Sequence, residues 1–546
     1  MIGARADRRR STLPAVLLTL LLAWLVLYPI LIVVVDAAHG EAVRAFAARG
    51  GEWRALWASV WISLASVALA AVVGVPLAFL FEWFEFPGRK LLGSLIALPV
   101  VLPPFVGVIA FLFLYGESGF AARFLQFVFR FEGAPWHLQG PGAILLVHAY
   151  SMYVYFYLFT RAGLARLDAA MLEAAQALGA NRGRTFLRVI LPLLRPSLAG
   201  AALLTFMTSL GSFSAPYVFG GGFRVMTTQI FASKQNGELA LAMVETVALA
   251  AIALLGLALL RRTEGDAILV GLGKGTAPRR RILRRSLVRT GTTIVGWGLA
   301  TLLLLPHLTL ILVSLVPYAT WTTETLPPVL SLVNYRRLLA EPERLEPLVN
   351  SLWMAAASTL AAVAIALGAG WLVVRRRSPL RRMIEGLLAL PWALPGTVFA
   401  VALATAFSVS APLQLRWVLV GTIVILPLAY LVRNLPVTGR AILAGYRQLD
   451  PALEEAAASL GAGAWRTLGR VTLPQLKPAL AAGASLAFVG ALGDFVTSII
   501  LYTYSNRPIA MEINAALRVN EFGVAAAFGV VLMVVSAVVL GIGARR

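Results

Sequence analysis

The chain of 546 residues contains no cysteine and few charged residues, and each scarcity excludes classes of protein. Without cysteine there is no disulfide, thiolate zinc site, iron–sulfur cluster or cysteine nucleophile. Charged side chains make up only 13% of the residues, whereas a soluble domain carries roughly 25%. The apolar side chains instead account for 59%. This composition predicts a protein that resides in a lipid bilayer.

Histidine is also scarce, and its four copies lie at no spacing that suits a metal ion: His39, His137, His148 and His307. His148 falls in a hydrophobic stretch, where we interpret it as a packed helix residue. No combination of serine, histidine and aspartate indicates a nucleophilic catalyst. We therefore expect no metal site, no bound cofactor and no catalytic residue on this chain.

Long apolar stretches are the dominant feature of the sequence. A helix needs about 20 apolar residues to cross the hydrocarbon core. Twelve stretches fit, at residues 14–35, 57–81, 91–115, 141–160, 191–219, 239–260, 290–317, 349–374, 385–408, 415–432, 474–501 and 522–542. Basic residues precede the first stretch, which is too long for a signal sequence and lacks a cleavage pattern after Val35. We expect it to stay attached, with the N-terminus in the cytoplasm.

The formal charge of +22 comes from an excess of lysine and arginine. The membrane topology accounts for their positions, so the charge does not indicate a nucleic-acid partner. They gather in the alternate loops that the twelve-span arrangement places inside, as positive residues do in the cytoplasm. Both termini are therefore expected to be cytoplasmic. The basic, glycine-containing stretch 261–289 is predicted to link two membrane domains, residues 1–260 and 290–546.

An internal repeat supports this division. Shifted by 282 residues, the segment 168–198 matches 450–480 without a gap, with 17 of the 31 positions identical. A second match, at 97–103 and 389–395, needs a shift of 292, so a loop between the two matches must differ in length. Six spans in each half give the halves the same sense in the membrane. The sequence predicts an all-α polytopic membrane protein of twelve transmembrane helices in two parallel six-helix repeats.

The repeated segments occupy loops predicted to be cytoplasmic, at about residues 165–190 and 447–472. Asp168 and Asp450 suit the N-cap of a short helix, and Pro451 suits its first position. Gly179 and Gly461 follow eleven residues after these caps, where a left-handed residue ends a helix of about three turns. The alanine-rich surface between permits close approach of another protein.

These loops resemble the EAA loop of binding-protein-dependent ABC importer permeases. The residues that carry the resemblance are Glu173, Ala174, Ala175, Gly179, Leu191 and Pro192, and Glu455, Ala456, Ala457, Gly461, Leu473 and Pro474. It implies a type I permease fold, in which each loop forms a coupling helix that sits in a cleft of an ATPase subunit. The remaining interpretation of each loop is an amphipathic helix without a partner.

The resemblance also implies the partners. They are two ABC ATPase subunits on the cytoplasmic side, which bind ATP and magnesium, an external or periplasmic solute-binding protein, and the lipid of a bacterial inner membrane. The chain has no ATPase motif of its own, because Gly273-Lys274-Gly275-Thr276 lacks both the preceding glycine and the hydroxyl residue directly after the lysine.

Polar residues near the ends of the fifth and eleventh predicted spans are the candidates for a translocation path: Ser212, Ser214, Asp494, Thr497 and Ser498. To place an ionisable group at membrane depth costs roughly 2.5 to 3.5 kcal/mol on insertion scales. Such a group therefore usually faces protein or water. Asp494 therefore indicates either a path, favouring a cationic cargo, or a hydrogen bond that joins two helices. Proline groups around Pro99 and Pro391 predict breaks or kinks in the third and ninth spans.

Among fused permeases, the chain most resembles those of ferric-iron importers, in the segments 211–217 and 504–508. Thiamine, polyamine, phosphonate and sulfate permeases share the architecture and stay open as alternatives. A secondary transporter of the major facilitator type would also have twelve spans in parallel halves. Residues 82–90 read EWFEFPGRK and lack the loop signature typical of that class.

Overall fold

The computed structural model describes residues 2–38, 40–264, 281–282, 286–317, 327–376, 378–408 and 418–544, and most of the predicted linker 261–289 lies outside them. The chain forms two compact units. One combines residues 47–232 and 248–330, and the other combines 1–46, 233–247 and 331–546. Each unit therefore includes the first long helix of the other half of the sequence, residues 286–314 in the first case and the helix that starts at residue 2 in the second. The two predicted domains, residues 1–260 and 290–546, therefore have different bounds from the two compact units.

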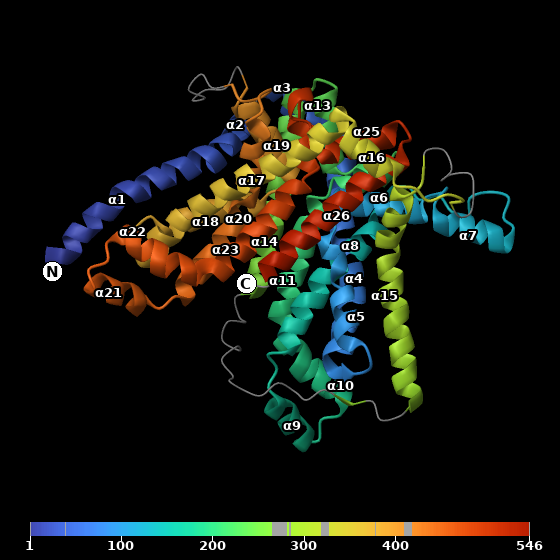
Figure 1. Ribbon diagram of the computed structural model, residues 1–546, viewed down its shortest axis with the longest axis horizontal. Coiled ribbons are helices and arrows are strands. Elements are labelled where there is room, and N and C mark those ends of the chain that lie inside the picture. The colour runs from blue at the N-terminus through green and yellow to red at the C-terminus, as the bar shows by residue number, and fades with distance from the viewer. Residues whose placement is uncertain are drawn as a thin grey trace. The chain divides into compact units, whose positions relative to one another are not determined.

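The first unit, residues 47–232 and 248–330, is built around three long helices that pack side by side, α4, α8 and α11 (Figure 1). Its elements are α4 (Gly50–Trp83), β1 (Phe84–Glu85), α5 (Arg89–Leu95), η2 (Leu98–Val101), α6 (Pro104–Tyr115), α7 (Phe120–Phe129), α8 (Gly140–Leu164), α9 (Ala169–Ala177), α10 (Arg182–Thr185), η3 (Phe186–Ile190), α11 (Leu191–Leu210), α12 (Ser214–Phe219), most of α13 (Met226–Gln235) and α14 (Leu239–Glu264), β2 (Arg281–Ile282) and α15 (Ser286–Ser314). The strands β1 and β2 form one short parallel pair.

Small residues allow the central helices of this unit to approach closely. A Cβ atom on Gly74 of α4 would lie 2.4 Å from the carbonyl oxygen of Tyr153 in α8. The buried hydroxyls of Ser59, Ser63 and Ser66 donate to carbonyls four residues earlier in α4, so no polar group of theirs faces lipid unsatisfied. Close approach and local satisfaction of hydroxyls are the usual basis of helix packing in membranes.

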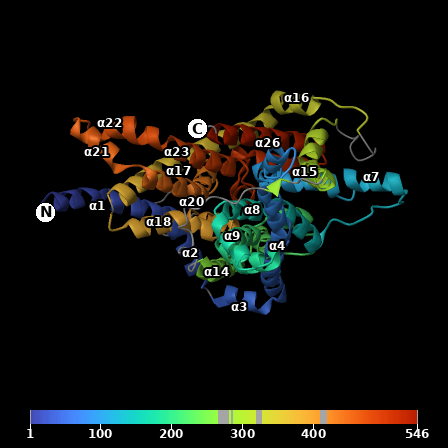
Figure 2. The ribbon, with the colours of Figure 1, turned by 90° about the horizontal axis from the view of Figure 1, so that it is seen from below.

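The second unit, residues 1–46, 233–247 and 331–546, repeats this plan with α17, α20 and α23 at its centre (Figure 1). Its elements are α1 (Ile2–Leu22), η1 (Ala23–Leu27), α2 (Tyr28–Ala37), most of α3 (Gly40–Ala48), α16 (Val333–Ala340), α17 (Pro342–Gly370), η5 (Trp371–Arg375), α18 (Arg381–Ala389), η6 (Leu390–Ala393), α19 (Gly396–Ala406), α20 (Ile425–Gln448), α21 (Pro451–Ser459), α22 (Ala464–Thr467), η7 (Leu468–Thr472), α23 (Leu473–Leu492), α24 (Val496–Leu501), η8 (Tyr504–Asn506), α25 (Ile509–Arg518) and α26 (Phe522–Ala544). The N-terminal helix α1 runs beside α18 (Figure 2).

The all-α membrane architecture is confirmed. Among the described residues, ten helices are long and apolar enough to cross a membrane, and a bent pair, 381–393 with 396–406, raises the number to eleven. The predicted span 415–432 has the wrong bounds, because residues 418–424 are not helical and the helix there is α20, residues 425–448. Residues 409–417 lie outside the described part. The arginines in the second half of α20 lowered its hydropathy and displaced the predicted span.

Four predicted spans are interrupted. The predicted proline breaks are confirmed, since α5 and α6 are separated by η2 around Pro99. In the second unit, α18 and α19 meet at 111° around Pro395. The predicted continuous spans 191–219 and 474–501 are wrong in their second part. Each helix ends at the repeated Leu-Gly dipeptide and restarts as α12 or α24, because the glycine, Gly211 or Gly493, leaves the helical conformation.

Candidate functional site

The two repeated loops fold into short helices with the predicted ends. At α9, the amide of Ala170 donates to Oδ1 of the N-cap Asp168 at 3.0 Å, and at α21 the amide of Ala452 donates to Asp450 at 2.9 Å. Gly179 and Gly461 adopt left-handed φ angles of 76° and 80°. Both caps were predicted because they depend on residues within a few positions along the chain.

The carbonyls of the alanine motif complete the C-terminal caps. The amide of Ala180 donates to the carbonyl of Ala175 at 3.0 Å, and Ala462 donates to Ala457 at 3.0 Å. This bond, six residues to one, defines a Schellman motif. Pro192 and Pro474 follow the π-helical turns η3 and η7, inside helices that run without a break from 182 to 210 and from 464 to 492.

Both short helices expose the same apolar side chains. Leu178 is 87% exposed and its repeat equivalent Leu460 is 89% exposed. No residue of α9 or α21 is buried. Figure 1 shows α9 beyond the ends of α4 and α11, and α21 beyond the end of α23, each within its own unit. A nearly bare leucine therefore stands at the same position in both copies.

The short helices are joined to their units by different chemistry. In the second unit, Glu454 of α21 pairs with Arg375 at 2.9 Å and accepts a hydrogen bond from Thr472 at 2.7 Å. The repeat equivalents of these residues in the first unit are Leu172, Trp83 and Ile190, which belong to one hydrophobic cluster. The same three positions therefore tie the short helix to the neighbouring spans, by charge in one copy and by apolar packing in the other.

Asp494 lies at the break between α23 and α24 and is held on several sides. Nη1 of Arg433 in α20 lies 2.5 Å from Asp494 Oδ2 and 3.0 Å from the hydroxyl of Thr497. Asp494 also accepts from the amide of Thr497 at 2.8 Å, which caps α24. The structure thus shows the interhelical contact that one of the two hypotheses for Asp494 requires. Ser498 bonds Tyr430 of α20 at 2.7 Å.

The equivalent break in the first unit carries no carboxylate. Ser212 bonds Nε2 of His148 at 2.9 Å, and Nδ1 of the same ring lies 2.9 Å from the hydroxyl of Ser66 and 3.2 Å from that of Ser209. His148 is buried at 2% exposure, which agrees with its interpretation as a packed residue. Ser214 is buried in α12, close in sequence to this cluster.

Sequence reasoning missed Arg433, Tyr430 and the polar partners of His148. Arg433 lay one residue beyond the predicted span 415–432, so it was read as a loop charge. The repeat offset of 282 contained a usable signal, because it places Tyr430 opposite His148 just as it places Asp494 opposite Ser212. Within the described part of the chain, no group of three or more His, Cys, Asp or Glu side chains is arranged to hold a metal ion.

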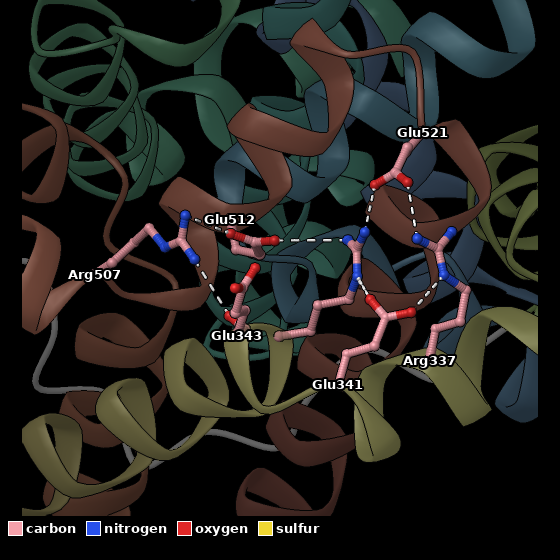
Figure 3. A network of polar contacts seen from close by, with 7 residues as sticks. Arg337, Glu341, Glu343, Arg507, Glu512 and Glu521 are labelled. Carbon is pink, nitrogen blue, oxygen red and sulfur yellow. Dashed lines mark hydrogen bonds and ion pairs between the residues drawn. The ribbon is translucent and has the colours of Figure 1, made fainter.

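A separate network of carboxylates and guanidinium groups joins α16, α17, α25 and the start of α26 in the second unit (Figure 3). Glu521 lies 2.9 Å from Arg337 and 2.7 Å from Arg344. Glu341 pairs with both arginines. Glu512 extends the network, at 3.7 Å from Arg344 and 3.1 Å from Arg507.

Protonation in this network follows its geometry. Hydrogen bonds from Arg337 and Arg344 lower the pKa of Glu341. Burial opposes the same effect at Glu521, but hydrogen bonds from Arg344 and Arg337 outweigh it and lower the pKa of that carboxyl. Burial raises the pKa of Glu512, against the attraction of Arg507 and Arg344. Glu512 is therefore the carboxylate that acid protonates first.

Comparison with known proteins gives one family. Residues 70–264 and 361–545 match the model of the binding-protein-dependent transport system inner membrane component. A probable ABC transporter permease protein, y4fN of Sinorhizobium fredii, is 30% identical over 462 residues, which cover 84% of this chain and 81% of the relative.

Two further relatives differ in the solute that their names give. The ferric transport system permease protein FbpB of Actinobacillus pleuropneumoniae is 30% identical over 80% of this chain and 63% of its own length. The sulfate transport system permease protein CysT of Escherichia coli is 30% identical over 31% of this chain and 64% of its own length. The chain therefore spans somewhat less than two thirds of the length of both.

Proposed function

Since the chain belongs to the family of binding-protein-dependent transport system inner membrane components, in two fused copies, we propose that it forms the translocation path of an ATP-driven importer and is driven by two ATPase subunits, one at α9 and one at α21. The family is one of transport subunits, and the secondary transporter of the major facilitator type is excluded by this membership.

The observation that carries the docking assignment is the pair of leucines, Leu178 and Leu460. A cytoplasmic leucine that is almost fully exposed loses the free energy of burial, about 1.5 to 3 kcal/mol for a whole side chain. The same loss at the same place in both copies is understandable if each leucine enters a pocket of a partner. The motif residues Glu173, Ala174 and Ala175, with Glu455, Ala456 and Ala457, lie on these two helices.

The proposed orientation follows from the positive residues. Both repeated loops, the linker 261–289 and both termini face the cytoplasm of a bacterial inner membrane, and the ion network around Arg344 and Glu521 faces outward. The solute-binding protein delivers the solute on that outer side. ATP and magnesium bind the partner subunits, since this chain has no phosphate-binding loop.

The proposed cargo is ferric iron. It is supported by the resemblance of residues 211–217 and 504–508 and by two relatives whose names give ferric transport. Sulfate is an alternative that a relative's name also gives, and thiamine, polyamines and phosphonates share the architecture.

The cargo is tested by reconstituting the chain with its ATPase subunits in proteoliposomes. The cognate binding protein is loaded in turn with iron(III), sulfate, thiamine, a polyamine or a phosphonate. We expect ATP hydrolysis to rise severalfold with the iron-loaded protein and to stay at the basal rate with the unloaded one. Stimulation by another solute and not by iron would remove iron and keep the importer assignment.

A further inference from the structure

Helix α20 carries three arginines on one face. Arg433, Arg440 and Arg447 are spaced by seven residues, so at about 100° per residue each lies some 20° from the next around the helix, and the outer two lie about 40° apart. We call these three residues the arginine row. Its contacts confirm the shared face, because each arginine meets the next part of the broken helix α18–η6–α19.

The contacts follow the broken helix in order. Arg447 pairs with Glu385 of α18 at 2.9 Å. The guanidinium carbon of Arg440 lies 4.3 Å from the ring centre of Trp392 in η6. A Cβ atom on Gly396, the first residue of α19, would lie 2.8 Å from Nη1 of Arg433. A glycine at this break therefore leaves the space that the deepest guanidinium occupies.

The arginine row exists in one copy only. At the repeat offset of 282, the equivalents in α8 are Ser151, Leu158 and Ala165. All three of these residues are uncharged, and the arginine that α8 does contain, Arg161, lies at a different position and pairs with Glu82 at 3.4 Å. The three arginines are thus not needed to build or insert a helix at this position of the fold.

The depth of the arginine row argues against a role as a simple membrane anchor. Fourteen residues separate Arg447 from Arg433, which is about 21 Å along a helix, whereas the hydrocarbon core is about 30 Å thick. Arg447 lies just before the short helix α21, at the end proposed to be cytoplasmic. Arg433 therefore lies deep in the membrane, where an arginine is costly unless it faces protein or water.

In the ion pair between Arg433 and Asp494, the arginine is the more exposed partner. The side chain of Asp494 is 5% exposed, whereas that of Arg433 is 33% exposed. The contacts described for Arg433 leave from Nη1 alone, and a guanidinium group has five N–H donors. A solute at this level would meet guanidinium N–H groups, because the carboxylate is covered. The exposed guanidinium thus favours an anionic solute, whereas Asp494 taken alone favours a cationic one.

We infer that the arginine row contacts an anionic solute, one that presents oxyanion or carboxylate oxygens, on its way along α20 to the cytoplasm. Guanidinium groups bind such oxygens through parallel hydrogen bonds. The inference rests on the proposed importer function and specifies its solute class. Ferric iron would fit as a complex with anionic oxygen ligands, and sulfate would fit directly. An anionic lipid headgroup is the other source of this chemistry, but it would not reach Arg433, which is held deep by Asp494.

The test measures solute transported per ATP hydrolysed in proteoliposomes that hold the complete importer. The solute is whichever one stimulates ATP hydrolysis when loaded on the binding protein. The variants are Arg440→Gln, the neutral double variant Arg433→Gln/Asp494→Asn, and Arg440→Lys, which keeps the charge. Arg382→Gln, an exposed arginine of α18 outside the row, is the matched control. Each variant is measured in phosphatidylcholine alone and with added phosphatidylglycerol.

We expect both neutral variants to lower the ratio about tenfold in either lipid, as loss of a hydrogen bond to a charged group does. Arg440→Lys should retain most of the ratio, and Arg382→Gln should retain all of it. The inference is overturned if the neutral variants transport normally, if they fail only with phosphatidylglycerol present, if Arg382→Gln fails equally, or if the stimulating solute is thiamine or a polyamine. If sulfate is the solute that stimulates ATP hydrolysis, iron is removed as the proposed cargo. The arginine row is then tested by measuring sulfate transport in the same variants.

Discussion

Gly163 and Gly445 occupy equivalent positions of the two copies, and at both a neighbouring helix fills the place of a side chain. A Cβ atom on Gly445 would lie 2.7 Å from Cβ of Ala479 and 3.0 Å from Cδ2 of Leu476. On Gly163 it would lie 2.6 Å from the hydroxyl of Ser197. These glycines set the distance between α20 and α23, and between α8 and α11.

Gly445→Ala should destabilise the protein by about 1 to 3 kcal/mol, because the new methyl group would collide with the methyl group of Ala479, which cannot rotate out of the way. Gly368→Ala in α17 is the matched control, since nothing lies within 4 Å of its Cβ position. That change should leave stability unchanged or raise it, given the higher helix propensity of alanine. Thermal unfolding midpoints in detergent measure both. Equal midpoints for the two variants would show that the close approach is unimportant.

Which residues were predictable depended on the distance over which they act. Asp168 and Gly179 were identified because a cap involves neighbours within a few residues. Asp494 was identified as an unusual charge, but its partner was not, since Arg433 is 61 residues away and only the folded chain brings them together. The role of Gly445 depends on Ala479 in another helix and was equally invisible in the sequence.

The ion network of Figure 3 joins the ends of four helices and makes their association depend on pH. The folded-state pKa of Glu521 is lowered, so its contribution is present above the ordinary glutamate pKa, about 4.3. It is lost as the pH falls through the lower folded-state value. Glu341 behaves in the same way.

Glu521→Gln should therefore lower the thermal midpoint most between pH 6 and 7, and the difference from the unaltered protein should shrink as the pH falls below about 4.3. Glu512→Gln is the control, because the pKa of Glu512 is raised and its protonation begins above that value. As the pH falls, the difference in thermal midpoint between Glu512→Gln and the unaltered protein should therefore begin to shrink at a higher pH than it does for Glu521→Gln. A Glu521→Gln difference that stays constant down to pH 3.5 would contradict the assigned contacts.

Helix boundaries were predictable where apolar length alone decides them. The span 522–542 agrees with α26, since that helix has no charge. The bounds of α20 were wrong because this helix carries the arginine row. The breaks before α12 and α24 were missed because Leu-Gly followed by a polar residue does not lower hydropathy enough. For α20 the copy-to-copy comparison at 282 residues is a better guide than hydropathy, because it places this helix opposite α8.

For the whole molecule, the family and the repeat follow from sequence, but the exchange of first helices between the two compact units does not. Residues 1–46 group with the second half of the sequence, and residues 248–330 group with the first. Hydropathy identifies a helix that crosses the membrane but contains nothing about which neighbour it packs against. Packing depends on side-chain contacts such as that of Tyr28 with Ala406.

The central claim is that α9 and α21 each dock one ATPase subunit, and native mass spectrometry of the purified complex tests it by counting them. Leu178→Asp and Leu460→Asp suit this purpose because both side chains are almost fully exposed, so neither change disturbs the fold. We predict two ATPase subunits on the unaltered chain, fewer on each single variant and none on the double variant, with the chain itself intact. Two ATPase subunits retained on the double variant would contradict the account.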